Sequence, residues 1–266
     1  MLKEPYRHMW YGEKQVCSVL SLHCKGLTEQ DVADEIGVCW RTVERWLVKF
    51  TGLLARFLAN KKPKTCRRLH TDELFLKMGK SFVYVWDSLA FELNWLTLAP
   101  FGWRDNEGAS RLLERSPRPL DELYSDGAFA YWQPIRDTYG IGFKNTQHVI
   151  CQNENKSKNN VMEGQQSIVR RFTRPRRGFY DITTATRHLQ RFEYYRNFVR
   201  NRADGSKPPA VRLGYVHYQP KTSIKQRFAQ LLQDALSFWR WITHRQCQEF
   251  RRNREQKVFI CEFSEL

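Results

Sequence analysis

Three acidic residues have types and contexts that could bind divalent cations together. Asp72 lies in a run of strand-forming residues, Asp126 follows a short strand-like stretch, and Glu163 begins a helical pattern. Mg²⁺ prefers oxygen ligands, and two such ions about 3.5–4 Å apart can activate an attacking oxygen and stabilise a leaving one. The three carboxylates are therefore candidates for two-metal chemistry on phosphodiesters.

Neighbouring elements would have to bring these acids together. The runs 69–76 and 81–86 flank Gly79 and predict a β-hairpin that carries Asp72. Acids on two neighbouring strands and on a helix packed across them can converge although they are far apart in the sequence. Taken singly, each position also has a structural explanation, as an exposed hairpin acid, an Asp-Gly turn or a helix-capping glutamate. The joint arrangement favours a shared site.

The motifs around the acids resemble those of the DDE-type transposases of bacterial and archaeal insertion sequences. The resemblance covers residues 10 to 215, and its motifs are DEL at 72–74, WD at 86–87, SDGAFAY at 125–131, NNVME at 159–163, RGF at 177–179, YRNFVR at 195–200 and PPAVRLGY at 208–215. It implies an α/β fold with an RNase H-like catalytic core. In that core Asp72, Asp126 and Glu163 would be the catalytic residues and would hold two Mg²⁺ ions, with Mn²⁺ as a substitute. The chain departs from the family pattern at Gly164, where a polar or basic helix former is usual.

A second motif precedes the acids, between residues 27 and 50. It predicts two short helices around a turn at Gly37, with Thr28 as the N-cap of the first helix and a further helix over 13–24 completing a three-helix unit. This pattern is typical of a helix-turn-helix, whose second helix enters the major groove of DNA. The residues expected to face outward near the start of that helix are Trp40, Arg41, Glu44 and Arg45. The alternative to a helix-turn-helix is a helical hairpin that only packs against the rest of the protein and does not bind DNA.

The charge of the chain indicates a polyanionic partner. The 266 residues carry a net charge of +16, and residues 165–266 contain 21 lysines and arginines against 8 aspartates and glutamates. No apolar run approaches the ~20 residues of a membrane-spanning helix, so nucleic acid fits this charge better than a membrane. A basic, solvated surface without a partner is the weaker alternative. Besides the helix-turn-helix residues, the candidates for DNA contacts are Lys77, Lys80, Arg104, His148, Arg170 and Arg171.

Composition also bounds the organisation of the chain. A hydrophobic content of 41% supports a packed core. We expect a helix-turn-helix domain over 1–60, the RNase H-like domain over 65–216 and a basic helical C-terminal extension over 217–266. An amphipathic helix at about 222–254 could serve core packing, dimerisation or DNA binding. The seven cysteines show no Cys-x-x-Cys spacing and are expected to be reduced thiols.

These observations together predict a transposase that binds double-stranded DNA, both the element's ends and the target, and catalyses Mg²⁺-dependent strand cleavage and strand transfer. A homodimer or higher homo-oligomer on DNA is expected, with no membrane partner. The N-terminus lacks a secretory apolar stretch, so we expect the cytoplasm of a prokaryotic cell, and the nucleoid when the protein is DNA-bound. Two alternative functions would each explain part of these observations. One is a catalytically inactive, transposase-derived DNA-binding regulator, and the other is an RNase H-like nuclease without strand transfer.

Overall fold

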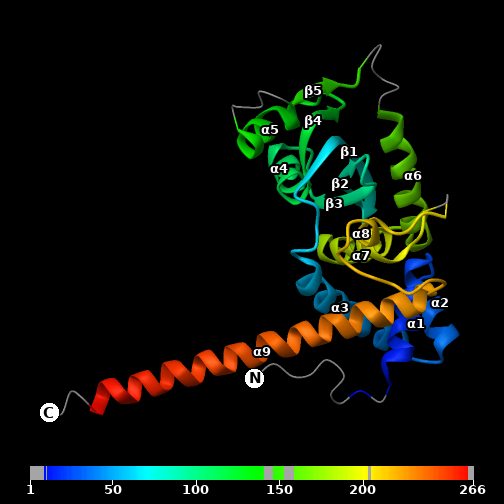
Figure 1. The fold of residues 1–266 in the computed structure, drawn as a ribbon. Coiled ribbons are helices and arrows are strands. Elements are labelled where there is room, and N and C mark those ends of the chain that lie inside the picture. Colours follow the sequence, from blue (N-terminus) through cyan, green and yellow to red (C-terminus); the bar gives the residue numbers. More distant parts are fainter. Residues whose placement is uncertain (1–8, 10, 141–145, 153–158, 203–204, 263–266) are drawn as a thin grey trace.

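The computed structural model describes residues 9, 11–140, 146–152, 159–202 and 205–262. A five-stranded sheet lies in the upper part of the molecule in Figure 1, and helices cover both of its faces. The strands are β1 (Thr65–Met78), β2 (Ser81–Ala90), β3 (Trp95–Phe101), β4 (Arg118–Ser125) and β5 (Gln147–Ile150). The helices are α1 (Glu13–Cys24), α2 (Glu29–Ile36), α3 (Trp40–Leu58), α4 (Asn106–Arg115), α5 (Trp132–Tyr139), α6 (Asn160–Thr173), α7 (Ile182–Tyr194), α8 (Pro209–Arg212) and α9 (Ile224–Glu262).

The sheet has the strand order β3-β2-β1-β4-β5. β2 runs antiparallel to β1 and β3, whereas β1, β4 and β5 are parallel to one another. This order and these strand directions are those of an RNase H-like fold, so the expected fold class is confirmed. The predicted hairpin is present, and its turn depends on Gly79, whose φ of 58° lies in the left-handed region that favours glycine.

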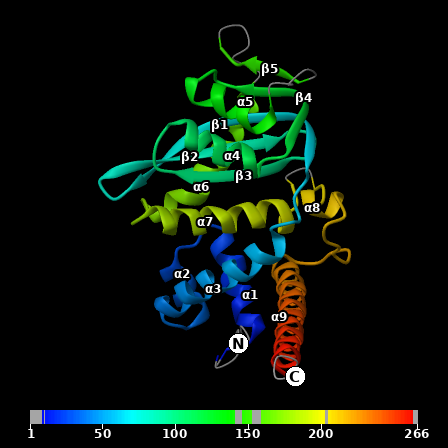
Figure 2. The same cartoon turned by 90° about the vertical axis from the view of Figure 1, so that its left-hand side faces the viewer.

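Both faces of the sheet are covered, which explains why the centre of β1 is buried on both sides. α4 and α5 pack on one face, where the Trp86 ring meets Tyr131 edge-on at 5.3 Å between centroids. α6 lies against β1 on the other face. Gln166 of α6 also donates a hydrogen bond to Asp87 of the neighbouring strand β2. α7 runs between the sheet and the N-terminal helices (Figure 2). The sheet is thus a rigid platform with a helix beside the acid-bearing strand.

The N-terminal helices have the arrangement that the sequence predicts. Thr28 caps α2 through a reciprocal capping box with Asp31, and Gly37 ends α2 with a left-handed φ of 74°. The expected apolar positions of α1, α2 and α3 are buried, among them Val16, Leu20, Val32, Val43 and Leu47. The three-helix unit is therefore present, and its role in DNA binding is taken up below.

The long helix α9 begins against the three-helix unit and then extends away from the rest of the protein (Figure 1). Phe228, Leu231, Leu232 and Ala235 of its first part are fully buried, and α9 contacts α1 and α3. Core packing therefore explains the first part of the helix. Within the described residues, no helix is both long and apolar enough to cross a membrane. Cys17, Cys24, Cys39 and Cys66 are free thiols.

A buried polar cluster joins the three-helix unit to the core. His23 of α1 is fully buried, and its Nε2 lies 3.0 Å from a carboxylate oxygen of Glu29. Arg176, at the end of the turn after α6, contacts His23 and lies 3.3 Å from Glu29. Burial lowers the pKa of His23 to about 3, with the positive charge of Arg191 adding to this effect. His23 is therefore neutral in the folded protein.

One prediction concerns two of the glycines that lie inside helices, Gly108 and Gly164. A Cβ on Gly108 would lie 2.1 Å from Nε1 of the buried Trp86, whereas a Cβ on Gly164 would meet nothing within 4 Å. Gly108→Ala should lower the free energy of unfolding by about 2–3 kcal/mol because the core must shift. Gly164→Ala should raise it by about 0.5–1 kcal/mol because alanine loses less backbone entropy in a helix. Urea unfolding measures both, and similar effects of the two variants would contradict this packing.

A second prediction concerns pH. His23 stays neutral when folded but is protonated below about pH 6.5 when unfolded, so its contribution destabilises the fold as pH falls through that value. Between pH 7.5 and 5.5 the free energy of unfolding of the wild type should fall by about 1.4 kcal/mol more than that of His23→Gln. Urea titrations at both pH values test this. Parallel pH profiles would show that His23 is accessible to protons in the folded protein.

Candidate active site

The parallel pairing of β1 with β4 places two of the predicted acids side by side. His70 of β1 pairs with Tyr124 of β4, so two residues further on Asp72 lies level with Asp126, directly after the end of β4. Gly127 follows with a φ of 82°, and a Cβ there would lie 2.5 Å from Ile150 of β5. The chain can therefore turn away from the sheet at this point while the Asp126 carboxylate stays beside β1.

A third carboxylate joins this pair, but it belongs to Glu73. Oxygen atoms of Asp72, Glu73 and Asp126 all lie within 4.8 Å of one another. The Asp72 carboxylate accepts a hydrogen bond of 2.8 Å from the Glu73 amide, and that of Asp126 accepts one of 2.9 Å from the Ala128 amide. These bonds hold the oxygens in place near the carboxyl end of β4.

Arg104 neutralises part of the charge of this acidic group. Its guanidinium forms ion pairs with Glu73 and, at 2.6 Å, with Asp126. Tyr131 also donates a hydrogen bond of 3.4 Å to Glu73. Arg104 is one of the residues predicted to contact DNA, and in the structure it bridges two acids of the site instead of standing free.

Burial strongly affects the ionisation of these acids. Burial, reinforced by the negative charge of Asp126, raises the pKa of Asp72 to about 6 and that of Glu73 to about 7. Burial also raises the pKa of Asp87, the partner of Asp72 on β2, well above its usual range. Crowded carboxylates of this kind favour a bound cation, and the atoms that they offer as metal ligands are all oxygens. The group therefore fits a hard divalent cation such as Mg²⁺.

Glu163 lies on the helix beside the acids, but its side chain is exposed and is outside the acidic group. Asn159, which caps α6, donates a hydrogen bond of 3.5 Å to Asp72, and Gln166 donates one of 3.4 Å to Asp87. Residues 159, 163 and 166 share one helical face because they are spaced by four and three residues. Glu163 therefore lies at the exposed edge of the face of α6 that contacts the two aspartates.

The other predicted contact residues fall into two sets. At the start of α3, Trp40, Arg41, Glu44 and Arg45 are all exposed, and the Arg41 guanidinium lies 5.5 Å from the centre of the Trp40 ring. The remaining residues lie on the core, with Lys77, Lys80 and Arg171 exposed, Arg170 bonded to Gln166, and His148 bonded at 2.8 Å to Ser125 beside Asp126.

Sequence reasoning did not identify Glu73 as a member of the site. Neighbouring residues of a strand point to opposite faces of a sheet, so the strand pattern alone gives no reason to place Glu73 beside Asp72. The opposite charges of Glu73 and Arg104 were visible in the sequence, but only the fold shows that they meet.

Comparisons with known proteins place this site in a family. Among solved structures, the chain is similar to the magnesium-bound HTLV-2 integrase catalytic core domain, with 10% identity, 55% of this chain and 94% of that chain covered, and a TM-score of 0.35. It is also similar to the BIV integrase catalytic core domain, with 12% identity, 55% and 94% coverage, and a TM-score of 0.36. A chain of the simian T-cell lymphotropic virus intasome in complex with the PP2A regulatory subunit B56 gamma is 8% identical, with 77% and 80% coverage and a TM-score of 0.42.

No curated protein matches the chain in sequence. The family model of the DDE domain of IS240-type transposases, however, matches residues 66–202, which is more than half of the chain. The match includes Asp72, Glu73, Asp87, Asp126 and Glu163. The chain therefore belongs to the family of DDE-type transposases.

Proposed function

We propose that the protein is a transposase that cleaves double-stranded DNA at the ends of a mobile element and joins those ends to target DNA. The observation that carries this proposal is the convergence of Asp72 and Asp126 in a partly buried acidic group beside the helix that carries Glu163. DNA cleavage and joining both require charge stabilisation at a phosphodiester, and a carboxylate site that holds divalent cations supplies it.

In this proposal Asp72, Asp126 and Glu163 hold two Mg²⁺ ions, with Mn²⁺ as a substitute. The bound cations would lower the pKa of a water molecule and stabilise the leaving oxygen. Glu163 completes the ligand set by turning its exposed side chain toward Asp72. The hydrogen bonds from Asn159 and Gln166 support this step because they fix the register of α6 against the acids.

The other residues of the site have positioning roles in this proposal. Arg104 holds Asp126 and Glu73 through its two ion pairs, and the Ala128 amide orients the Asp126 carboxylate. Glu73 is therefore assigned as the partner of Arg104 and not as a third metal ligand. The bond between His148 and Ser125 stabilises the end of β4 next to Asp126.

DNA binding is assigned to the three-helix unit and to the basic surface. The exposed residues at the start of α3, Trp40, Arg41, Glu44 and Arg45, would enter the major groove. Lys77 and Lys80 at the hairpin end, together with Arg170 and Arg171 on α6, would contact phosphates of the strand held at the acids. The net charge of +16 supports a DNA partner. We expect a homodimer or higher homo-oligomer on DNA, acting in a prokaryotic cytoplasm.

The catalytic assignment predicts a graded loss of activity. Asp72→Asn, Asp126→Asn and Glu163→Gln should each lower Mg²⁺-dependent cleavage of labelled element ends by more than about 100-fold, because a direct metal ligand is lost. Glu73→Gln should lower it by about 10–100-fold, as expected for a group that supports a ligand. Glu107→Gln, which removes an exposed acid of α4 paired with Arg111, is the matched control.

The outcomes of this experiment separate the competing functions. Cleavage without joining of the ends would support a nuclease, and specific binding without cleavage by the wild type would support a DNA-binding regulator. Full activity of Glu163→Gln together with complete loss in Glu73→Gln would replace Glu163 by Glu73 as the third ligand.

The recognition assignment predicts a loss of discrimination. An arginine that contacts a base edge contributes about 1–3 kcal/mol of discrimination, so Arg41→Ala or Arg45→Ala should weaken binding to element ends more than binding to random DNA. Fluorescence anisotropy on both duplexes measures the ratio. Arg136→Ala, an exposed arginine on α5, serves as the control. Equal losses on the two duplexes would restrict Arg41 and Arg45 to phosphate contacts.

A further inference from the structure

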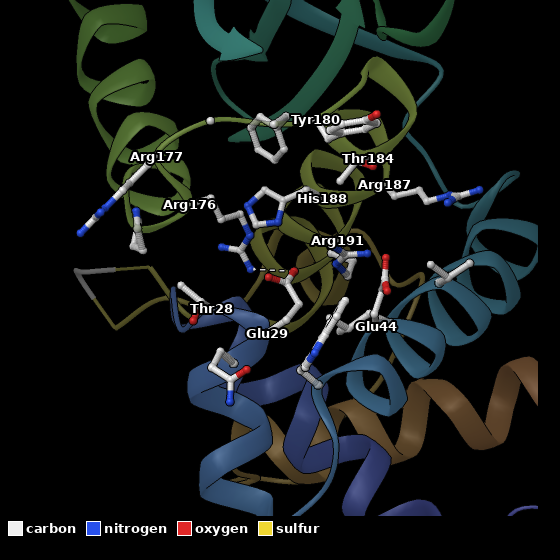
Figure 3. A pocket seen from close by; sticks show the side chains of 17 residues that line it. Thr28, Glu29, Glu44, Arg176, Arg177, Tyr180, Thr184, Arg187, His188 and Arg191 are labelled. Atoms are coloured by element: carbon white, nitrogen blue, oxygen red, sulfur yellow. Dashed lines mark hydrogen bonds and ion pairs between the residues drawn. The ribbon is translucent and has the colours of Figure 1, made fainter. Parts of the chain in front are cut away.

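A cavity of about 400 Å³ lies between the three-helix unit and the core. Figure 3 shows His188 and Arg191 of α7 on one side of it, with Glu29 of α2 and Glu44 of α3 on the other. The cavity is separate from the acidic group, since none of the three clustered acids lines it. It is large enough for a group of the size of a phosphate and its attached sugar.

One stripe of α7 supplies the polar wall of this cavity. Thr184, Arg187, His188 and Arg191 all line it, and their spacing of three, one and three residues places them on a single helical face. Arg177, which follows the turn after α6, adds a further exposed cation. The wall therefore presents several positively charged or neutral hydrogen-bond donors to one space.

Two of these side chains are buried and have polar atoms without hydrogen-bond partners. Arg191 is 6% exposed and His188 is 1% exposed. The Nε atom of Arg191 and both ring nitrogens of His188 lack a partner, and Arg191 forms no ion pair with a carboxylate among the residues that the structure describes. Burial lowers the pKa of Arg191 to about 10, which leaves it charged at neutral pH. A buried, unpaired guanidinium is costly, and an anion in the cavity would offset that cost.

The charge of the surroundings favours an anion over a metal ion. His23, Glu29 and His188 have atoms close enough to ligate a cation, but Arg176 contacts both His23 and Glu29 and so occupies that position. With Arg176 paired to Glu29, three further arginines, 177, 187 and 191, line the cavity, against the single remaining carboxylate of Glu44. The cavity therefore has an excess of positive charge.

The position of the cavity connects it to the DNA surface proposed above. Trp40 and Glu44, at the start of α3, form part of its lining, and the ring of Tyr180 at the same cavity is 93% exposed. A DNA strand that passes α3 would thus meet these arginines before it reaches the core. Arginine is a frequent partner of phosphate groups, because its guanidinium can donate two parallel hydrogen bonds to the phosphate oxygens.

We propose that this cavity binds a phosphodiester of the DNA strand next to the segment read by α3, with Arg187 and Arg191 as the principal contacts. The inference rests on the DNA binding proposed above. The contact would fix the DNA relative to both the three-helix unit and the core, because α7 packs on β3 and the cavity is shared with α2 and α3. Recognition at α3 and delivery of the strand to the acids would then be mechanically linked.

The salt dependence of DNA binding tests this contact. Each phosphate contact contributes about 0.9 to the slope of log affinity against log salt on duplex DNA. With the full-length protein and a 40-bp duplex of random sequence in EDTA, Arg187→Gln should lower this slope by about 0.9, and Arg187→Lys should restore most of it. Arg177→Gln provides a second exposed position with the same expectation. Arg174→Gln, an exposed arginine of the same turn that does not line the cavity, should leave the slope unchanged.

The result that overturns the proposal is an unchanged slope in both cavity variants, or an equal fall in Arg174→Gln. Absence of DNA binding by the wild type would overturn it as well. Stabilisation of the wild type by inorganic phosphate that Arg187→Gln abolishes, with unchanged DNA slopes, would assign the cavity to free phosphate. Because the assay contains EDTA, it is independent of cleavage, so a failure of the catalytic proposal and a failure of this contact are distinguishable.

Discussion

The register between the parallel strands β1 and β4 is the constraint on which the site depends. It brings Asp72 and Asp126 level at the carboxyl end of β4, where the chain leaves the sheet through Gly127. A shift of one residue would move Asp72 to the other face of the sheet and separate the two carboxylates. The buried apolar residues of β1 and the helices on both faces resist such a shift, so core packing indirectly fixes the distance between the acids.

Burial of charge is the second constraint, and the protein meets it differently in two places. At the acids, Arg104 compensates two carboxylates that lie in a partly buried group, and the raised pKa values of Asp72 and Glu73 show that the compensation is incomplete. At the junction with the three-helix unit, Arg176 is paired with Glu29, whereas Arg191 is buried without an ion pair among the described residues. The first place therefore favours a cation and the second an anion, which agrees with the proposed binding of metal ions and DNA.

Local patterns predicted most of the fold, because they depend on short stretches of chain. The hairpin at Gly79, the capping box of Thr28 and the helix after Asn159 are each determined by a few neighbouring residues, and all are present. The membership of the acidic group was harder to predict. Glu73 and Arg104 meet only because β1 lies beside the segment that precedes α4, and Glu163 stays outside the group because its side-chain direction depends on tertiary packing. The polar residues of α7 that line the cavity have helical spacing in the sequence. That His188 and Arg191 have buried polar atoms without partners becomes visible only in the fold, where the three-helix unit covers them.

The central claim is that Asp72, Asp126 and Glu163 form one metal site, although the Glu163 side chain is exposed in the structure. A crystal structure of the wild type with Mn²⁺ and an element-end duplex, with the ions located by anomalous scattering, tests it most directly. The account predicts density for Mn²⁺ between Asp72 and Asp126, with the Glu163 carboxylate turned inward as a ligand and Arg104 still paired with Glu73. Density coordinated by Asp72, Glu73 and Asp126, with Arg104 displaced and Glu163 still in solvent, would contradict it.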